Sequence, residues 1–469
     1  MVFSSLIFLY LFLPACLLLY LIPGGVRYKN AVLILFSLLF YAWGEPIYLF
    51  LMIGIALANW SFGLLIGSFR RKALIVLAVV FDLGCLALFK YTGFLAENLN
   101  ALLHLSVPVP QIALPIGISF YTFQALTYTI DVWRAEVPVQ KSFFRFLLYV
   151  SLFPQLIAGP IVRYADVEQQ LENRSAAAED VFCGMRRFCV GLAKKVLLAD
   201  YCGKVASQIL DGSLSGSTTA MVWLGVLLFM FEIYFDFSGY SDMAIGLGRI
   251  FGFRYLENFD LPYCAGSITE FWRKWHISLS SFFRDYVYIP LGGNRKHMYR
   301  NLFIVWALTG LWHGASWNFV LWGVYFFVLL TIEKLLGRFV TKLPGLIRHI
   351  LTLFFILVGW NIFYHTDLSR LTESFRVLFG AAGTGFWDEM TRITLTNNLP
   401  LLLICAVGCS PIPRLVGIGF AACFAEKDAA GRKHKIYVGC VFVFCLLLLA
   451  LSTISLVGSS YNAFLYFRF

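Results

Sequence analysis

The stretch Phe303-Ile-Val-Trp-Ala-Leu-Thr-Gly-Leu-Trp-His-Gly-Ala-Ser-Trp-Asn-Phe-Val-Leu-Trp322 decides the fold class, because it is long enough to cross a bilayer and carries no formal charge. His313 lies near its centre. A charged side chain at that depth costs roughly 2.5 kcal/mol or more. Neutral imidazole can still take up or release a proton where water is scarce, so His313 is a candidate functional residue.

The composition of the whole chain points the same way. Its 469 residues are 60% hydrophobic and 13% charged, and the mean hydropathy is +0.77. A soluble core cannot absorb that much apolar surface, so we predict an all-α polytopic membrane protein. Phenylalanine-rich runs without alternation are not the strands of a membrane β-barrel. We expect one integral membrane domain over residues 1–469.

Basic residues outnumber acidic ones by 37 to 26, which gives a net charge of +11. They gather in short loops, which indicates membrane topology and contact with anionic lipid, not nucleic-acid binding. The basic loops 23–30, 68–72 and 423–436 are predicted to be cytoplasmic. Both chain termini are then predicted to be extracytoplasmic.

Apolar runs separated by turn residues predict twelve candidate spans. The run from Leu6 to Ile22 is longer than the core of a signal peptide, so we expect a retained first span. The predicted parts are N-terminal spans (1–111), a core (112–336), C-terminal spans (347–457) and a tail (458–469). The candidate spans are 3–22, 31–43, 46–67, 73–91, 112–133, 143–162, 219–240, 301–318, 319–336, 347–365, 398–422 and 437–457.

Proline and glycine interrupt two of these runs, at Pro115 with Gly117 and at Pro154 with Gly159-Pro160. Irregular backbone at membrane depth is tolerated where it lines a cavity, so these breaks indicate re-entrant segments around a polar chamber. The polar, basic stretch 163–205 predicts amphipathic helices at the membrane surface.

Residues 267–293 form a second unusual region. Read as one helix, the stretch places Thr269, Arg273, His276, Ser280 and Arg284 on a single face. Such a stripe suits an anionic ligand held against an aromatic wall. It equally suits an interfacial helix anchored among lipid headgroups. The neighbouring Asp285 is expected to pair with Arg284.

Small and polar residues surround His313. Thr309 and Ser316 are predicted on its helix face, and Gly310 with Gly314 would leave space beside the ring. This favours a substrate tunnel, with Trp312 and Trp317 as further candidate lining. The alternative is close helix packing through small residues, with His313 bonded across the interface.

Two acidic residues flank Phe237-Ser-Gly-Tyr-Ser241. Asp236 and Asp242 could face a cavity or cap helix ends, and the sequence leaves both readings open. The eleven cysteines show no zinc-ligand spacing, and Cys405 with Cys409 indicates packing, so we predict no metal site. Phosphate-loop, dinucleotide-binding, HExxH and nucleophile-elbow motifs are absent.

Three motifs resemble those of the membrane-bound O-acyltransferase (MBOAT) superfamily, in its alginate and peptidoglycan O-acetyltransferase branch. They are Trp272-Arg-Lys-Trp-His-Ile-Ser-Leu-Ser280, Arg284-Asp-Tyr-Val-Tyr-Ile-Pro-Leu-Gly-Gly293 and Thr309-Gly-Leu-Trp-His-Gly-Ala-Ser-Trp317. Further matches begin at Pro115, Phe153 and Tyr234, so the resemblance runs from residue 115 to 323. It implies a ring of tilted transmembrane and re-entrant helices around a central tunnel.

The resemblance also implies roles for individual residues. His313 matches the catalytic histidine of the superfamily, and His276 matches its second characteristic histidine. His313 would be the general base, while His276 would orient the acyl donor or polarise its carbonyl. In the tail Phe464-Leu-Tyr-Phe-Arg-Phe469, Tyr466 matches a proposed acyl-carrying tyrosine, although Arg468 stands where glutamine is common. An aromatic membrane anchor is the alternative role for Tyr466.

The implied reaction starts from a cytoplasmic acetyl thioester, with acetyl-CoA as co-substrate and no bound cofactor. The implied final acceptor is a polysaccharide, reached through an extracytoplasmic SGNH-type acetyltransferase partner. The implied location is the bacterial cytoplasmic (inner) membrane, in contact with lipid. D-alanyl transfer to teichoic acid is the alternative enzymatic reading. The non-enzymatic alternatives are a membrane transporter and a scaffold of a polysaccharide system. Neither would make or break a covalent bond.

Overall fold

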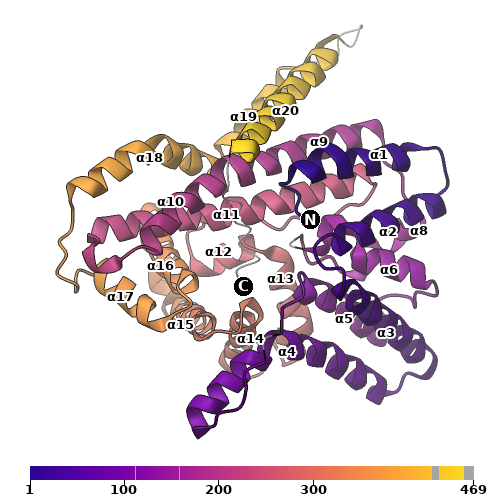
Figure 1. The fold of residues 1–469 in the computed structure, drawn as a ribbon, viewed down its shortest axis with the longest axis horizontal. Coiled ribbons are helices and arrows are strands. Elements are labelled where there is room, and N and C mark those ends of the chain that lie inside the picture. The colour runs from indigo at the N-terminus through magenta and orange to yellow at the C-terminus, as the bar shows by residue number, and fades with distance from the viewer. Residues whose placement is uncertain (111, 158, 425–431, 459–469) are drawn as a thin grey trace. The chain divides into compact units, whose positions relative to one another are not determined.

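The computed structural model describes residues 1–110, 112–157, 159–424 and 432–458, and every regular element in those ranges is a helix (Figure 1). The predicted all-α fold class is therefore confirmed. The chain forms two compact units, and two of the three boundaries between them fall within helices, whereas the third lies in the loop after residue 250. Unit 1 is Met1–Phe188 with Tyr240–Leu256, and unit 2 is Cys189–Gly239 with Glu257–Phe469.

Unit 1 holds the N-terminal helices. These are η1 (Phe8–Phe12), α1 (Leu13–Leu21), α2 (Val26–Ala42), α3 (Tyr48–Phe69), α4 (Lys72–Leu103), α5 (Ile118–Arg134), α6 (Phe143–Ser151), α7 (Phe153–Leu156), α8 (Tyr164–Glu172) and most of α9 (Ala178–Ala193). The end of α11 (Thr219–Ile250) also belongs to unit 1.

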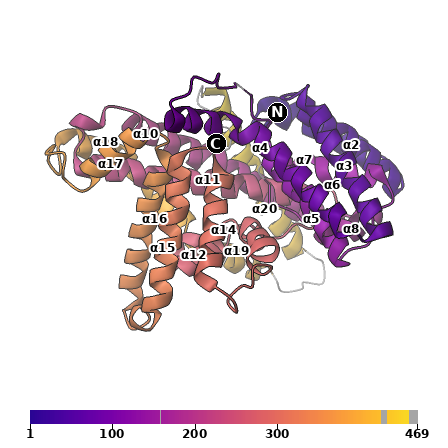
Figure 2. The same ribbon diagram turned by 90° about the horizontal axis from the view of Figure 1, so that it is seen from below.

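Unit 2 holds most of α11 and the remaining elements. These are η2 (Lys194–Ala199), α10 (Asp200–Leu210), η3 (Leu214–Gly216), η4 (Pro262–Cys264), α12 (Ile268–Lys274), α13 (Ile277–Phe283), η5 (Arg284–Tyr288), α14 (Met298–His313), α15 (Trp317–Val340), α16 (Gly345–Tyr364), α17 (Leu368–Leu378), α18 (Glu389–Gly408), α19 (Ile412–Ala422) and α20 (Arg432–Gly458). Figure 2 shows α14, α15 and α16 running side by side.

Seven of the described helices are long and apolar enough to cross a membrane. A multi-pass membrane protein follows from their number and composition. The seven segments are Tyr48–Phe69, Lys72–Leu103, Thr219–Ile250, Trp317–Gly337, Gly345–Tyr364, Glu389–Gly408 and Arg432–Gly458.

Several span boundaries differ from prediction. Helix α4 continues to Leu103, so most of the predicted 92–111 loop is helical. The predicted span 398–422 is two helices, because α18 ends at Gly408 and α19 begins after Pro411. The predicted span 301–318 ends at His313, where Gly314 adopts an extended conformation with φ −173° and ψ 159°. Turn-forming residues therefore set the ends of helices inside continuous apolar sequence.

The two predicted breaks in unit 1 are present and lie against each other. Gly117 precedes α5 with φ +76°, and a Cβ built there would lie 2.8 Å from the Leu156 carbonyl oxygen in α7. Glycine is required here both by the left-handed backbone and by the close approach. The polar chamber expected beside these breaks stays a prediction.

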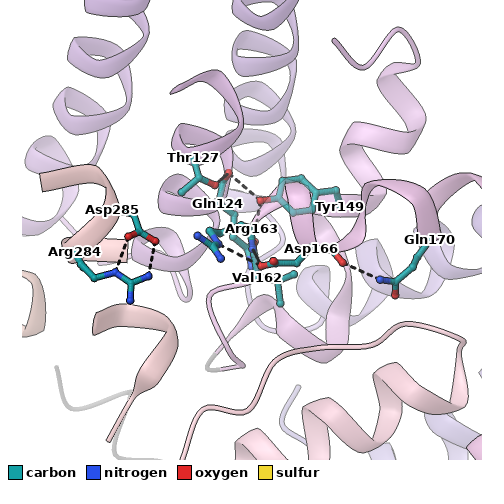
Figure 3. A network of polar contacts seen from close by, with 9 residues as sticks. All are labelled: Gln124, Thr127, Tyr149, Val162, Arg163, Asp166, Gln170, Arg284 and Asp285. Carbon is teal, nitrogen blue, oxygen red and sulfur yellow. Dashed lines mark hydrogen bonds and ion pairs between the residues drawn. The ribbon is translucent and has the colours of Figure 1, made fainter. Parts of the chain in front are cut away.

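A buried polar network surrounds the same region of unit 1 (Figure 3). The Tyr149 hydroxyl lies 3.0 Å from the carbonyl oxygens of Gln124 and Val162, and the Thr127 hydroxyl donates to Gln124 O at 2.8 Å. The Val162 carbonyl lies outside any helix, so the Tyr149 hydroxyl gives it a partner that secondary structure does not. These contacts join α5 and α6 to the chain before α8.

The stretch 163–205 is helical, as predicted, in α8, α9, η2 and α10. The buried residues of α10 lie on one helical face, which is the pattern of an amphipathic helix. They are Asp200, Cys202, Gly203, Ala206 and Leu210. Its placement at a membrane surface stays a prediction.

Candidate active site

His313 is the last residue of α14 and lies in an aromatic surround in unit 2. Its ring centroid is 5.0 Å from that of Trp322, 5.1 Å from that of Phe363 and 4.9 Å from that of Trp312. The residue is partly buried and retains some exposed surface. Its aromatic neighbours therefore do not enclose it completely.

The glycines beside His313 serve packing, so the predicted space beside the ring is wrong. A Cβ on Gly310 would lie 2.3 Å from the Phe319 carbonyl oxygen, and one on Gly314 would lie 2.3 Å from the Phe319 ring. On the facing helix, a Cβ on Gly323 would lie 2.4 Å from the Trp306 carbonyl oxygen. Missing side chains let α14 and α15 approach closely, as small residues do between membrane helices.

Replacing Gly310 by alanine is expected to destabilise the protein by roughly 1–3 kcal/mol, because the added methyl group meets backbone that cannot rotate away. Thermal unfolding of the purified chain in detergent measures this loss. Gly337→Ala, at the far end of α15, is the matched control, because no described atom lies within 4 Å of a Cβ there. An unchanged midpoint for Gly310→Ala would contradict the packing role.

The other residues predicted around His313 take different positions. The Thr309 hydroxyl donates to the Val305 carbonyl of its own helix at 2.7 Å, and the Ser316 hydroxyl donates to Thr366 O at 3.3 Å. Trp312 is buried, whereas Trp317 is 49% exposed. Trp312 is thus placed in the aromatic surround of His313, and Trp317 presents much of its side chain at the surface.

The predicted single helix over 267–293 is wrong. Helix α12 ends at Lys274, α13 begins at Ile277, and His276 between them has a left-handed backbone with φ +43° and ψ +56°. The predicted stripe is therefore broken, with His276 buried while Arg273, Ser280 and Arg284 are exposed. A non-glycine residue in this conformation is held by its surroundings, and such residues cluster at functional sites.

Arg284 and Asp285 pair locally, as predicted. The Arg284 Nε and Nη2 atoms lie 2.7 and 3.0 Å from the two carboxylate oxygens of Asp285 (Figure 3). Because the guanidinium is already engaged by this carboxylate, its capacity for an anionic ligand is reduced.

Two residues that the sequence analysis passed over hold the segment before His276. The Glu333 carboxylate on α15 accepts the backbone N–H groups of Ile268 and Thr269 at 2.7 and 3.2 Å, which caps α12. His349 Nδ1 on α16 lies 3.0 Å from the Ala265 carbonyl oxygen. Glu333 could have been identified from the sequence, because an acidic residue inside an apolar run is unusual.

The rings of His276 and His313 both lie close to the indole of Trp312. The Trp312 ring centroid lies 5.8 Å from that of His276 and 4.9 Å from that of His313. His276 is 2% exposed, and its ring packs on Phe237 at 4.6 Å. Burial lowers the pKa of His276 to about 3, so its imidazole is neutral at physiological pH.

Asp236 and Asp242 neither cap helix ends nor form one site. Asp236 lies within α11, 2.8 Å from the Lys195 ammonium, which also contacts Asp200 at 2.7 Å. Asp242 pairs with Arg187 at 2.9 Å. Burial alone would lower the pKa of Lys195, but the carboxylates of Asp236 and Asp200 outweigh it and raise that pKa. Lys195 is therefore a charged group shared by two buried acids.

Tyr466, the predicted acyl-carrying residue, lies outside the described residues. A third histidine, His365, is 4% exposed beside Tyr364. In the described ranges, no three His, Cys, Asp or Glu side chains gather closely enough to hold a metal ion.

Comparison with known proteins shows which family this chain belongs to. Residues 90–366 match the MBOAT, membrane-bound O-acyltransferase family. The chain is 42% identical to the probable alginate O-acetylase AlgI of Pseudomonas aeruginosa over 85% of this chain and 78% of that protein. It is 30% identical to the peptidoglycan O-acetyltransferase of Helicobacter pylori over 100% of this chain and 98% of that protein. It is 28% identical to the teichoic acid D-alanyltransferase of Bacillus subtilis over 53% and 68%.

The chain therefore belongs to the membrane-bound O-acyltransferase family and is an O-acyltransferase. The matched region begins earlier and ends later than the predicted core 112–336, and it contains both His276 and His313.

Proposed function

We propose that this chain takes an acetyl group from a cytoplasmic thioester donor, acetyl-CoA, and passes it across the membrane for O-acetylation of an envelope or exopolysaccharide. The observation that carries the proposal is the 42% identity to an alginate O-acetylase over 85% of the chain. The partly exposed imidazole in an aromatic surround supplies a group suited to the chemistry.

His313 is the general base in this proposal. It accepts the proton of the acceptor hydroxyl while that oxygen attacks the thioester carbonyl. The C–S bond then breaks, an ester forms, and the proton passes from the imidazolium to the leaving thiolate. The rings of Trp322 and Phe363 limit the access of water, which disfavours hydrolysis of the thioester.

The path of the acetyl group follows from where donor and acceptor lie. The first hydroxyl is that of Tyr466, or of a serine in an extracytoplasmic SGNH-type partner, and the polysaccharide is the final acceptor. The predicted cytoplasmic position of the basic loops and the predicted extracytoplasmic position of the termini support this direction. The bacterial inner membrane is the matching location.

His276 serves the donor in this proposal. It either orients the donor or polarises its carbonyl, because its ring packs on the same Trp312 indole as the ring of His313. Arg273 and Arg284 are exposed and belong to the same unit, so they remain candidates for the phosphates of the donor.

D-alanyl transfer is the weaker enzymatic alternative. The D-alanyltransferase relative matches 53% of this chain at 28% identity, whereas the alginate O-acetylase matches 85% at 42%. Membership of an acyltransferase family argues against a transporter or a scaffold.

Deleting the gene for this chain from its host tests the proposal. We expect acetyl esters to disappear from one polysaccharide of the envelope, while D-alanyl esters of the same cells stay unchanged. Ester release by mild base and quantification of acetate and D-alanine measures both. Loss of D-alanine alone would favour the alternative, and unchanged amounts of both would overturn the proposal.

A further inference from the structure

The hydrogen bonds around Asn258 determine which nitrogen of His276 carries a hydrogen. His276 Nδ1 lies 3.1 Å from Asn258 Oδ1, and that oxygen also accepts the backbone N–H of Ser278 at 3.2 Å and the Ser278 hydroxyl at 2.9 Å. A backbone N–H can only donate, so the carboxamide must present its oxygen on this side. An amide oxygen can only accept, so the hydrogen of the neutral imidazole is on Nδ1.

The backbone holds this arrangement in place. Asn258 O accepts the N–H of Ile277 at 3.0 Å, and Asp260 N donates to Lys274 O at 3.0 Å. The segment before η4 is thus bonded on both sides of His276. Asn258 itself is fully buried, so bulk water does not reach its oxygen.

The other ring nitrogen is left with a lone pair and no protein partner. Among the described residues, no group forms a hydrogen bond with the buried His276 Nε2. The ring packs edge-to-face with Phe237 at 4.6 Å and at a tilt to Trp312 at 5.8 Å between ring centroids. An unsatisfied buried acceptor is costly, which makes a ligand hydrogen the natural partner.

We infer that Asn258 is a positioning residue that fixes the tautomer of His276, so that His276 Nε2 accepts a hydrogen bond from an N–H or O–H group of the substrate. The identity of that substrate rests on the proposed function, whereas the tautomer does not. A nitrogen without a hydrogen cannot polarise a carbonyl. Of the two roles considered for His276, orientation of the substrate is therefore the one that fits.

Two substrate groups offer such a hydrogen. One is the amide N–H in the arm of a pantetheine-type thioester donor, and the other is the hydroxyl of the acceptor. Either group would donate a hydrogen bond to Nε2. An acyl donor that lacks the amide hydrogen distinguishes between them.

The tautomer is tested by NMR of the full chain in lipid nanodiscs with ¹⁵N-labelled histidine, the His276 signal being assigned from its loss in His276→Gln. We expect the Nδ1–H form in the unsubstituted protein. In Asn258→Leu the ratio of the two tautomers should shift by roughly 2- to 10-fold toward Nε2–H, the effect of one lost hydrogen bond. Asn258→Asp, whose carboxylate can only accept, should keep Nδ1–H. Ser280→Ala is the matched control, because it removes a nearby exposed hydroxyl that donates to Trp272 O, a bond that involves neither Asn258 nor the His276 ring.

Transfer from the acetyl thioester of N-acetylcysteamine, compared with that from its N-methylated analogue, identifies the source of the hydrogen. A preference for the N–H donor that is lost in Asn258→Leu assigns the donor amide. Equal use of both donors, with kcat lowered in Asn258→Leu, assigns the acceptor hydroxyl. An Nε2–H signal in the unsubstituted protein, or an unchanged tautomer ratio in Asn258→Leu, would overturn the inference. Absence of any acyl transfer would instead remove the proposed function, and the NMR result would still decide the role of Asn258.

Discussion

Acyl transfer by the His313→Ala variant is expected to be about 10²- to 10⁴-fold slower than by the unsubstituted chain, which is the typical contribution of a general base. The substitution removes the only group we assign to proton removal from the acceptor hydroxyl. Because the ring is partly exposed at the end of α14, its loss should leave the fold intact. Labelled acetate incorporated into envelope polysaccharide, in cells producing each variant, measures the rate.

The control for this prediction is His434→Ala, which removes an exposed histidine from α20. It should acetylate at the normal rate, and both variants should be present in the membrane in normal amounts. Normal acetylation by His313→Ala would eliminate the proposed role of this histidine. A variant that is missing from the membrane would instead indicate a structural role.

Replacing Lys195 by methionine is expected to destabilise the protein by roughly 3–5 kcal/mol, the usual effect of removing one partner from a buried ion pair. The Lys195 ammonium lies 2.7 and 2.8 Å from Asp200 and Asp236, and all three side chains are buried. Without it, two carboxylates remain together in an apolar surround. The thermal unfolding midpoint of the purified chain in detergent reports the loss.

A second ion pair provides the comparison. Arg187 and Asp242 are also 2.9 Å apart, but their side chains are 29% and 17% exposed. Arg187→Met should therefore cost roughly 1 kcal/mol or less. Adding Asp200→Asn to Lys195→Met should restore part of the stability, because one buried charge is removed. If Lys195→Met and Arg187→Met had equal unfolding midpoints, the greater burial of the Lys195 ion pairs would not contribute to stability.

The sequence predicted the membrane-spanning architecture because apolar composition over 20 residues is a local property. It missed the break at His276, because Trp-Arg-Lys-Trp-His-Ile-Ser contains neither glycine nor proline. The left-handed conformation there is imposed by partners far along the chain, such as Asn258 and Glu333. Tertiary contacts of this kind override local helix preference.

The spacing of residues in the sequence predicted only part of the candidate site. Small residues beside His313 were read as open space, and only the facing helix reveals that Phe319 fills it. Lys195 and Asp236 are 41 positions apart, so no helical periodicity could pair them. His276 and His313 were linked through family resemblance, and their common contact with Trp312 was not deducible from the sequence.

The close approach of α14 and α15 has a further consequence for how this protein operates. Gly310 meets the Phe319 carbonyl and Gly323 meets the Trp306 carbonyl, so the two helices are interlocked at two levels. Sliding one helix along the other by a turn, about 5.4 Å, would force side chains into both contacts. The position of His313 relative to Trp322 is thus fixed by the packing of the two helices. Donor and acceptor must therefore diffuse to His313, because the histidine cannot move toward them.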